Sequence, residues 1–144
     1  AVRFAEEDVR PMGREARGVR GMMLDPAQSV ISMLVAKGEE QSVLTATENG
    51  FGKRTAIAEY TRHGRGTKGM IAIQASDRNG KLIGAVLVSD SDELMLISTG
   101  GVLIRTLVQD IREMGRSTQG VTLINLDDGT KLAGMEKIIE TDEE

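Results

Sequence analysis

The sequence has no cysteine and no tryptophan, and it contains one histidine, two prolines, one tyrosine and two phenylalanines. Without cysteine the chain cannot form a disulfide, a thiolate metal site or a cysteine nucleophile. A single histidine also excludes a His-rich metal centre. Because aromatic residues make up only 2% of the chain, we expect a core of aliphatic side chains and methionine. So few aromatics argue against stacking platforms for single-stranded nucleic acid.

Long hydrophobic segments are also missing. The longest nearly apolar run, Val30 to Ala36, is too short to cross a bilayer, and no basic segment leads into an apolar one as in a signal peptide. We therefore expect a cytoplasmic chain with no membrane partner. The carboxylates Asp90, Asp92 and Glu93 are typical of a turn, and His63 of a surface loop, so we predict no catalytic residue and no metal site.

The net charge of −4 argues at first against a nucleic-acid partner. Its distribution argues the other way, because residues 127–144 carry a net −5 and residues 1–126 a net +1. Within that body, Lys53 to Lys68 carries +4 and Arg10 to Arg20 carries +3. A single basic run is typical of a solvated face. Basic runs that recur at one position of a repeat would instead indicate a binding surface.

Such a repeat is present. When the sequence is shifted by 51 residues, Arg54 falls on Arg105 and Gly64-Arg65 falls on Gly115-Arg116, and a shift by 102 brings Arg3 onto Arg105. The chain therefore holds about 2.8 units of roughly 51 residues and starts within a unit. We expect it to be a fragment of a longer array.

Each unit is predicted to be antiparallel β structure. In one unit, four short β-branched runs occupy residues 69–75, 82–88, 93–98 and 102–106. Asn79-Gly80 is the preferred pair for a type I′ hairpin turn. Short helical turns are expected within residues 5–9 and 107–114. Four-stranded units with this period favour a radial, propeller-like array.

Four motifs resemble one known family over essentially the whole chain. They are Glu-Glu-Asp-Val-Arg-Pro-Met-Gly-Arg at 6–14, Arg-Gly-Val-Arg-Gly at 17–21, Thr67-Lys68-Gly69, and Met-Gly-Arg-Ser-Thr-Gln-Gly-Val at 114–121. The chain resembles the C-terminal domain of DNA gyrase A, part of a type IIA topoisomerase. The resemblance implies an all-β fold, the β-pinwheel, a disc of about six blades of four antiparallel strands. It further implies that a basic rim wraps duplex DNA to support ATP-dependent negative supercoiling in the bacterial cytoplasm, in association with the nucleoid.

From this resemblance we expect residues 1–138 to form a partial β-pinwheel. We predict a partial blade at 1–24, blades at 25–73 and 74–126, a closing strand at 127–138, and the start of an acidic tail at 139–144. No cofactor is expected in this chain. ATP and Mg²⁺ would act elsewhere in the holoenzyme, whose other parts are the rest of gyrase A and gyrase B.

The family's glutamine-arginine-arginine-glycine-glycine-lysine-glycine box is not intact. In its nearest counterpart, residues 63–69, four residues match (Arg65, Gly66, Lys68 and Gly69) and His63, Gly64 and Thr67 depart. This is typical of the degenerate copies that later blades carry. The C-terminal domain of the corresponding protein of topoisomerase IV, which is more degenerate still, is the nearest family alternative. A propeller-like platform for protein partners remains open as a different class.

The candidate site is the set of basic, glycine-rich loops. In a radial array these loops would form an arc, in which Arg and Lys neutralise phosphates and position a duplex without reading its bases. We therefore predict sequence-nonspecific binding of duplex DNA, with bendability mattering more than base identity. For the strand-end arginines Arg3, Arg54 and Arg105, pairing within the fold and contact with DNA both remain open. The predicted DNA-binding residues are Arg14, Arg17, Arg20, Lys53, Arg54, Arg62, Arg65, Lys68, Arg105, Arg112 and Arg116, and the predicted structural glycines are Gly21, Gly69 and Gly120.

Overall fold

The computed structural model describes residues 1–139, so the part of the predicted acidic tail from residue 140 onward lies outside the described residues. Residues 1–139 form three short 3₁₀ turns and seven strands, and every pairing between named strands is antiparallel. The all-β prediction is confirmed. Within this part of the chain, no helix has the length and apolar character to span a membrane. The elements are η1 (Glu6–Asp8), β1 (Ser42–Thr47), β2 (Phe51–Ala56), η2 (Ile57–Glu59), β3 (Leu82–Val88), β4 (Glu93–Ser98), β5 (Leu103–Leu107), η3 (Val108–Asp110), β6 (Val121–Thr122) and β7 (Leu132–Lys137).

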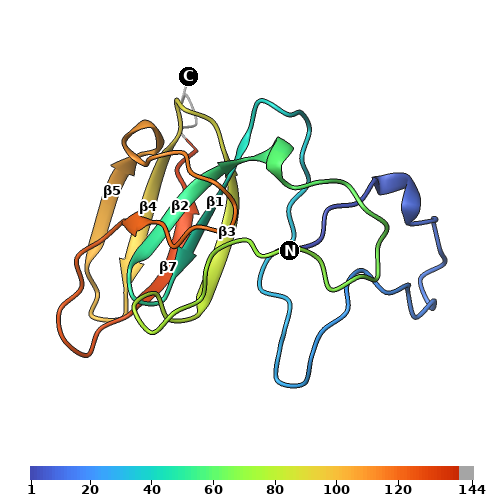
Figure 1. The fold of residues 1–144 in the computed structure, drawn as a ribbon, viewed down its shortest axis with the longest axis horizontal. Helices are drawn as coiled ribbons and strands as arrows, with labels where there is room; N and C mark the ends of the chain where they lie inside the picture. The colour runs from blue at the N-terminus through green and yellow to red at the C-terminus, as the bar shows by residue number, and fades with distance from the viewer. Residues whose placement is uncertain (140–144) are drawn as a thin grey trace.

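The strands form two sheets, with the orders β3-β1-β2-β6 and β5-β4-β7. They lie next to each other at one side of the molecule (Figure 1). Leu44 of β1 and Leu94 of β4 are fully buried in one cluster, and Ala46 and Leu96 are buried in a second. The aliphatic residues of the two central strands thus form the core between the sheets, as the shortage of aromatics requires.

The four runs predicted to form one unit do not share a sheet. Residues 69–75 form no strand, and β3 pairs with the preceding hairpin β1–β2, while the hairpin β4–β5 pairs with β7. Each sheet therefore draws on runs that are far apart in the chain. Apolar periodicity predicts where a strand can form, but it does not say whether an edge is present for that strand to join. The blade boundaries at 24/25, 73/74 and 126/127 stay predictions.

Two hairpin loops follow the 51-residue period. The Gly50 N–H donates to the Thr47 carbonyl and the Gly101 N–H donates to the Ser98 carbonyl, both at 3.1 Å, and the two glycines have φ of +87° and +82°. This pattern is a three-residue loop that ends in a left-handed residue, a position that glycine occupies without strain.

The type I′ turn predicted at Asn79-Gly80 is wrong, because Gly80 has a positive φ and Asn79 does not. Asn79 is instead fully buried, and its side-chain amide donates to the carbonyls of Gln74 at 2.9 Å and Gln119 at 2.8 Å. Its short amide therefore joins two loops. The helical turns predicted within 5–9 and 107–114 are confirmed as η1 and η3.

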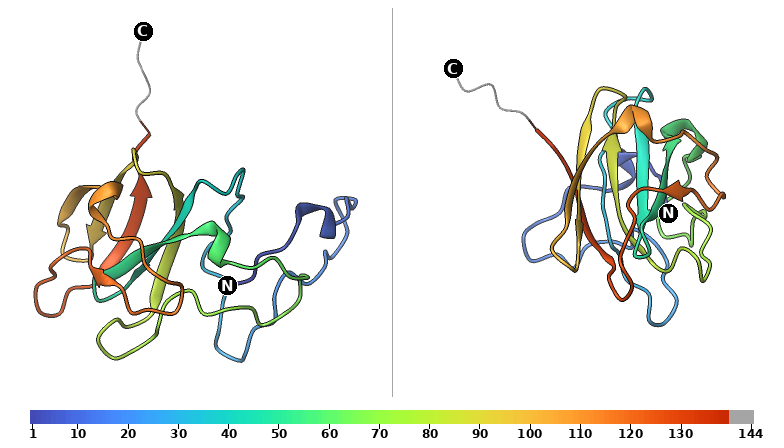
Figure 2. Two further views of the ribbon diagram at one scale, coloured as in Figure 1. Left: turned by 45° about the horizontal axis from the view of Figure 1, so that its top comes forward. Right: turned by 90° about the vertical axis from the view of Figure 1, so that its left-hand side faces the viewer.

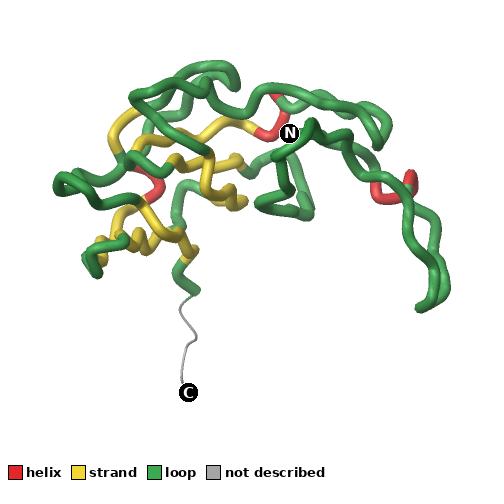
Figure 3. Tube along the Cα trace, turned by 90° about the horizontal axis from the view of Figure 1, so that it is seen from below, coloured by secondary structure: helices red, strands yellow, loops and turns green. Residues whose placement is uncertain are grey.

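Residues 1–41 contain no strand and form long loops to one side of the sheets (Figure 2). Figure 3 shows the same division, with strands gathered at one end and loops at the other. The first residues are nevertheless held against residue 70, because the Met70 N–H donates to the Ala1 carbonyl at 2.6 Å. This pair is the 51-residue counterpart of the pair between Gly52 of β2 and Val121 of β6.

Candidate nucleic-acid interface

Backbone contacts between the units repeat with the same period as the sequence. The His63 N–H donates to the Arg3 carbonyl, and 51 residues later the Met114 N–H donates to the Arg54 carbonyl, both at 2.9 Å. The Met23 N–H donates to Thr67 at 2.8 Å, and the Gln74 N–H donates to Thr118 at 3.0 Å. The repeat is therefore present in the structure as well as in the sequence. It places the loops at 61–68 and 112–119 at equivalent positions of successive units.

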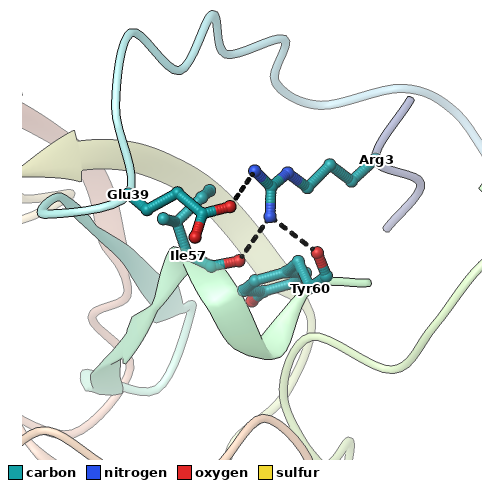
Figure 4. A network of polar contacts seen from close by, with 4 residues as sticks. All are labelled: Arg3, Glu39, Ile57 and Tyr60. Atoms are coloured by element: carbon teal, nitrogen blue, oxygen red, sulfur yellow. Dashed lines mark hydrogen bonds and ion pairs between the residues drawn. The ribbon is translucent and has the colours of Figure 1, made fainter. Parts of the chain in front are cut away.

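The prediction of strand ends for Arg3, Arg54 and Arg105 is wrong, because Arg54 and Arg105 lie within β2 and β5 and Arg3 lies in no strand. Arg3 and Arg54 form one repeated set of side-chain contacts. Arg3 Nη1 donates to the carbonyls of Ile57 at 3.1 Å and Tyr60 at 3.0 Å, and Arg3 Nη2 pairs with Glu39 at 3.2 Å (Figure 4). Arg54 repeats this pattern. It pairs with Asp90, 36 residues on, and donates from Nε to the Ile111 carbonyl, 57 residues on, at 2.6 Å.

For these arginines the sequence left two roles open, pairing within the fold and contact with DNA. The Arg54 side chain is only 11% exposed, so its guanidinium is engaged within the fold and offers little surface to DNA. Arg105, the third member of the series, pairs with Glu93 and remains about half exposed.

The loop arginines form a second repeated set. Arg65 Nη1 donates to the Arg20 carbonyl at 3.2 Å, and Arg116 Nη1 donates to the Ile71 carbonyl at 2.7 Å, so each reaches 45 residues back along the chain. Arg65 Nε also donates to the Asp8 carbonyl at 3.0 Å. A guanidinium has five N–H donors, and these contacts use one or two of them. Arg65 and Arg116 are half-buried, and each can fasten its loop while it still binds a phosphate.

The other predicted contacts lie on the surface. Arg14, Arg17 and Arg20 are exposed on the N-terminal segment, and Arg62, Lys68 and Arg112 are exposed on the two loops. Lys68 lies 3.1 Å from Asp25, with both side chains more than half exposed. Such a pair contributes little in water, so a phosphate can replace the carboxylate. The contacts of Arg65 with the carbonyls of Asp8 and Arg20 hold the loop 61–68 against the N-terminal segment. The exposed cations of that loop and of the N-terminal segment therefore lie in one region of the surface.

The prediction that Lys53 contacts DNA is wrong, because its side chain is fully buried. Its ammonium donates to the carbonyls of Gly115 at 2.7 Å and Thr118 at 2.9 Å, to the Thr118 hydroxyl at 3.1 Å, and to the Arg116 carbonyl. Burial lowers the pKa of Lys53 to about 8, an effect that Arg116 reinforces and Glu59 opposes. Lys53 is therefore a buried cation of the fold rather than a surface contact. The sequence carried a signal of this, because its repeat counterparts Val2 and Ile104 are apolar.

The three glycines do not share one role. Gly69 has φ +81° and Gly120 has φ +83°, and a Cβ at these positions would overlap the backbone of Ala1 and of Gly52 in β2, respectively. Only glycine permits both the conformation and the close approach. Gly21 has no positive φ, and no atom lies within 4 Å of the place where a Cβ would stand, so neither constraint applies there.

The sequence patterns did not single out Arg78, which also contacts this site. Arg78 lies over the Phe51 ring at 4.1 Å and donates to the Gln119 side chain at 3.2 Å and to the Gly120 carbonyl at 3.3 Å. With Asn79, it ties the end of the loop 112–119 to the sheet. Arg78 stands outside the basic runs, so charge patterning could not find it.

The three carboxylates predicted to form a turn, Asp90, Asp92 and Glu93, have partners within the fold. Asp92 accepts the Ser89 N–H at 2.7 Å, Asp90 pairs with Arg54, and Glu93 pairs with Arg105. Across residues 1–139 no three His, Cys, Asp or Glu residues are grouped closely enough to hold a metal ion.

Comparison with known proteins identifies the family. The family described as "DNA gyrase C-terminal domain, beta-propeller" matches residues 1–37, 41–89 and 92–138, which is three segments along the chain. DNA gyrase A of Pseudomonas aeruginosa is 52% identical over 139 residues, which cover 96% of this chain and 15% of that protein. DNA gyrase A of Escherichia coli K12 is 46% identical over 144 residues, covering 99% of this chain and 16% of that protein.

Solved structures show the same relationship. A DNA gyrase A C-terminal domain superposes with a TM-score of 0.85 at 29% identity, over 94% of this chain and 46% of that one. A topoisomerase IV C-terminal domain superposes with a TM-score of 0.86 at 25% identity, over 94% of this chain and 42% of that one. The chain spans about 15% of the length of the curated relatives it matches. The repeated units, the antiparallel sheets and these matches together show that the chain belongs to the DNA gyrase C-terminal domain family.

Proposed function

We propose that this chain binds and bends duplex DNA, without sequence specificity, as part of the DNA-wrapping module of a gyrase A protein. One observation carries the proposal: cationic loops occur at equivalent positions of successive units, joined by contacts that repeat every 51 residues. B-DNA carries one negative charge per about 1.7 Å of its axis. A series of cations spaced by a regular repeat is a matching surface for such a polyanion.

The chemistry of these loops favours the phosphate backbone over base edges. Exposed Arg and Lys and glycine-rich backbone bind phosphate oxygens, which set the position of a duplex but carry no sequence information. Bending the duplex from one loop to the next costs elastic energy, which the added phosphate contacts offset. This is physical support for wrapping, and it predicts a preference for flexible DNA.

In the proposed role the chain contributes no bond-making or bond-breaking step. It would act with the rest of gyrase A and with gyrase B in the bacterial cytoplasm, on nucleoid DNA. ATP-driven negative supercoiling would use ATP and Mg²⁺ bound elsewhere in that assembly. The curated gyrase A relatives, at 52% and 46% identity in the two bacteria named, favour gyrase. Among the solved domains the difference is small, at 29% identity for gyrase A and 25% for topoisomerase IV.

The test is a salt titration of binding to a duplex of about 40 base pairs, which is short relative to the persistence length of about 150 base pairs. The chain should bind at low salt, and log K should fall linearly with log salt. Arg65→Ala with Lys68→Ala should make the slope shallower by about 1.8, because each lost phosphate contact removes about 0.9. The matched control is Lys37→Ala with Lys81→Ala, two exposed cations outside the basic loops.

Two results would overturn the proposal. One is no binding of duplex DNA at about 50 mM salt, where electrostatic binding is strong. The other is an equal effect of the loop pair and the control pair. Ligation of relaxed plasmid in the presence of the chain then tests bending, because wrapped DNA shifts the distribution of topoisomers and unbent DNA leaves it unchanged.

A further inference from the structure

Lys53 stands in a position that is apolar in the other units. Val2 and Ile104 are its counterparts at intervals of 51 residues, and each of the three residues directly precedes the repeated arginine of its unit. A fully buried lysine costs more than the apolar residues it replaces unless its ammonium is well bound. The middle unit therefore carries an unusual group whose contacts must account for it.

All the acceptors of Lys53 belong to a single loop. They are neutral oxygens of residues 115, 116 and 118, more than 60 residues away in the chain. The Thr118 hydroxyl in turn donates to the Gly115 carbonyl at 2.8 Å, which closes the loop on itself. One ammonium thus holds the turn that carries Arg116 and that follows the exposed Arg112.

The equivalent loop of the preceding unit is held in another way. Residues 64–67 are fastened by the Gly66 N–H, which donates to the Gly21 carbonyl at 2.7 Å, and by Arg65 itself. Val2, at the place of Lys53, has no side-chain donor to offer. The two basic loops therefore have the same position in the repeat but different supports.

We propose that Lys53 is a positioning residue for DNA binding, which holds the loop 115–118 so that Arg116 and its neighbours face a duplex, although Lys53 itself touches no DNA. The proposal rests on the proposed function for its DNA readout. It assigns one basic loop a support that the other lacks, so its consequences are selective. Loss of Lys53 should weaken the contribution of Arg116 and leave that of Arg65 intact.

The first experiment measures the loop without DNA. Hydrogen exchange of the amides of residues 115–120 and 64–69 is compared between the unaltered chain and Lys53→Met, which keeps the length of the side chain and removes its donors. Ile104→Met, at the apolar counterpart, is the matched control. We expect faster exchange at 115–120 alone in Lys53→Met and no change in the control. Equal protection of both loops in all three proteins would overturn the proposal, whatever the chain does with DNA.

The second experiment is a pair of double-mutant cycles on duplex binding at about 0.1 M salt. If the loop supplies one phosphate contact, Lys53→Met should weaken binding by about eightfold. Each phosphate contact adds about 0.9 to the slope of log K against log salt, and at about 0.1 M salt this amounts to a factor of about eight in K. Lys53→Met combined with Arg116→Ala should lose less than the two single effects together. Lys53→Met combined with Arg65→Ala should be additive.

The outcomes separate this inference from the proposed function. If the unaltered chain does not bind DNA, the proposed function fails and hydrogen exchange still decides whether Lys53 holds the loop. If the chain binds and Lys53→Met binds equally well, or both cycles are additive, the positioning role is refuted. Should Lys53→Met not fold, Thr118→Val removes one acceptor of Lys53 from the loop side, and the same exchange and binding pattern is expected at smaller amplitude.

Discussion

The stability of this protein should rise with pH above about 8 because of Lys53. Burial lowers the pKa of Lys53 in the folded chain from its ordinary 10.5 to about 8. Below pH 8 the folded and unfolded states both hold the proton. Between pH 8 and 10.5 the unfolded state holds a proton that the folded state has released, so the free energy of unfolding increases with pH. This stability is complete above pH 10.5 and is lost as the pH falls through 8.

The size of the effect follows from the pKa difference. At 1.36 kcal/mol per pKa unit, the full contribution is about 3 kcal/mol, and about 2 kcal/mol of it should be present at pH 9.5 relative to pH 7. Tyr60 acts in the opposite direction, because burial raises its pKa to about 12. Its unfolded form ionises near pH 10, so the measurement is best kept below that value.

The assay is urea unfolding followed by far-ultraviolet circular dichroism at several pH values from 7 to 9.5. Lys53→Met is measured in parallel, since it lacks the titrating group and retains all the others. The unaltered chain should gain about 2 kcal/mol relative to the variant over this range. Parallel pH profiles of the two proteins would refute the assignment of a buried, titrating ammonium to Lys53.

Three further predictions concern the repeated contacts, the glycines and the open edge of the second sheet. In urea unfolding, Arg54→Ala should destabilise the fold by about 2 kcal/mol, because it leaves the Ile111 carbonyl without its donor. Asp90→Ala removes a side chain that is 81% exposed and should cost below about 1 kcal/mol. Equal costs of the two substitutions would contradict this prediction. In thermal melts Gly120→Ala should cost more than Gly101→Ala, since both glycines have positive φ but only Gly120 meets the neighbouring backbone; the reverse order would show that the approach is not tight. Among the described residues β5 has no partner on its outer edge, and Leu103 of this strand is 60% exposed. The chain should therefore self-associate in analytical ultracentrifugation, and Leu103→Lys should reduce this association. Identical behaviour of the two proteins would refute a role for that edge.

Most of the local structure could be predicted from the sequence, and most of the pairing could not. The runs at 82–88 and 93–98 became β3 and β4 because alternating and β-branched apolar residues favour strands wherever they pair. The run at 69–75 has similar composition and forms no strand. The difference lies in the surroundings, because a strand needs an adjacent edge of the right register, and periodicity carries no information about that edge.

The candidate site divides in the same way. Charge and repeat placed Arg65, Lys68 and Arg116 together on equivalent loops, and the structure keeps them there. Lys53 belongs to the same basic run in sequence, yet its ammonium is buried. Arg78 belongs to no run, and it fastens the end of the basic loop. Both depend on contacts across 40 residues or more, which a local pattern cannot show.

By itself, the sequence determined the period of the repeat, the antiparallel β character, the aliphatic core and the segregation of charge into basic loops, because all of these are set by which residue types occur at which spacing. The tertiary structure alone decided which strands share a sheet, which arginines act as fasteners between units, and which cation is removed from the surface. The physical reason is that the cost or benefit of a charged side chain depends on its burial and its partners. For Lys53 and Arg54 these are provided by residues from the next unit of the chain.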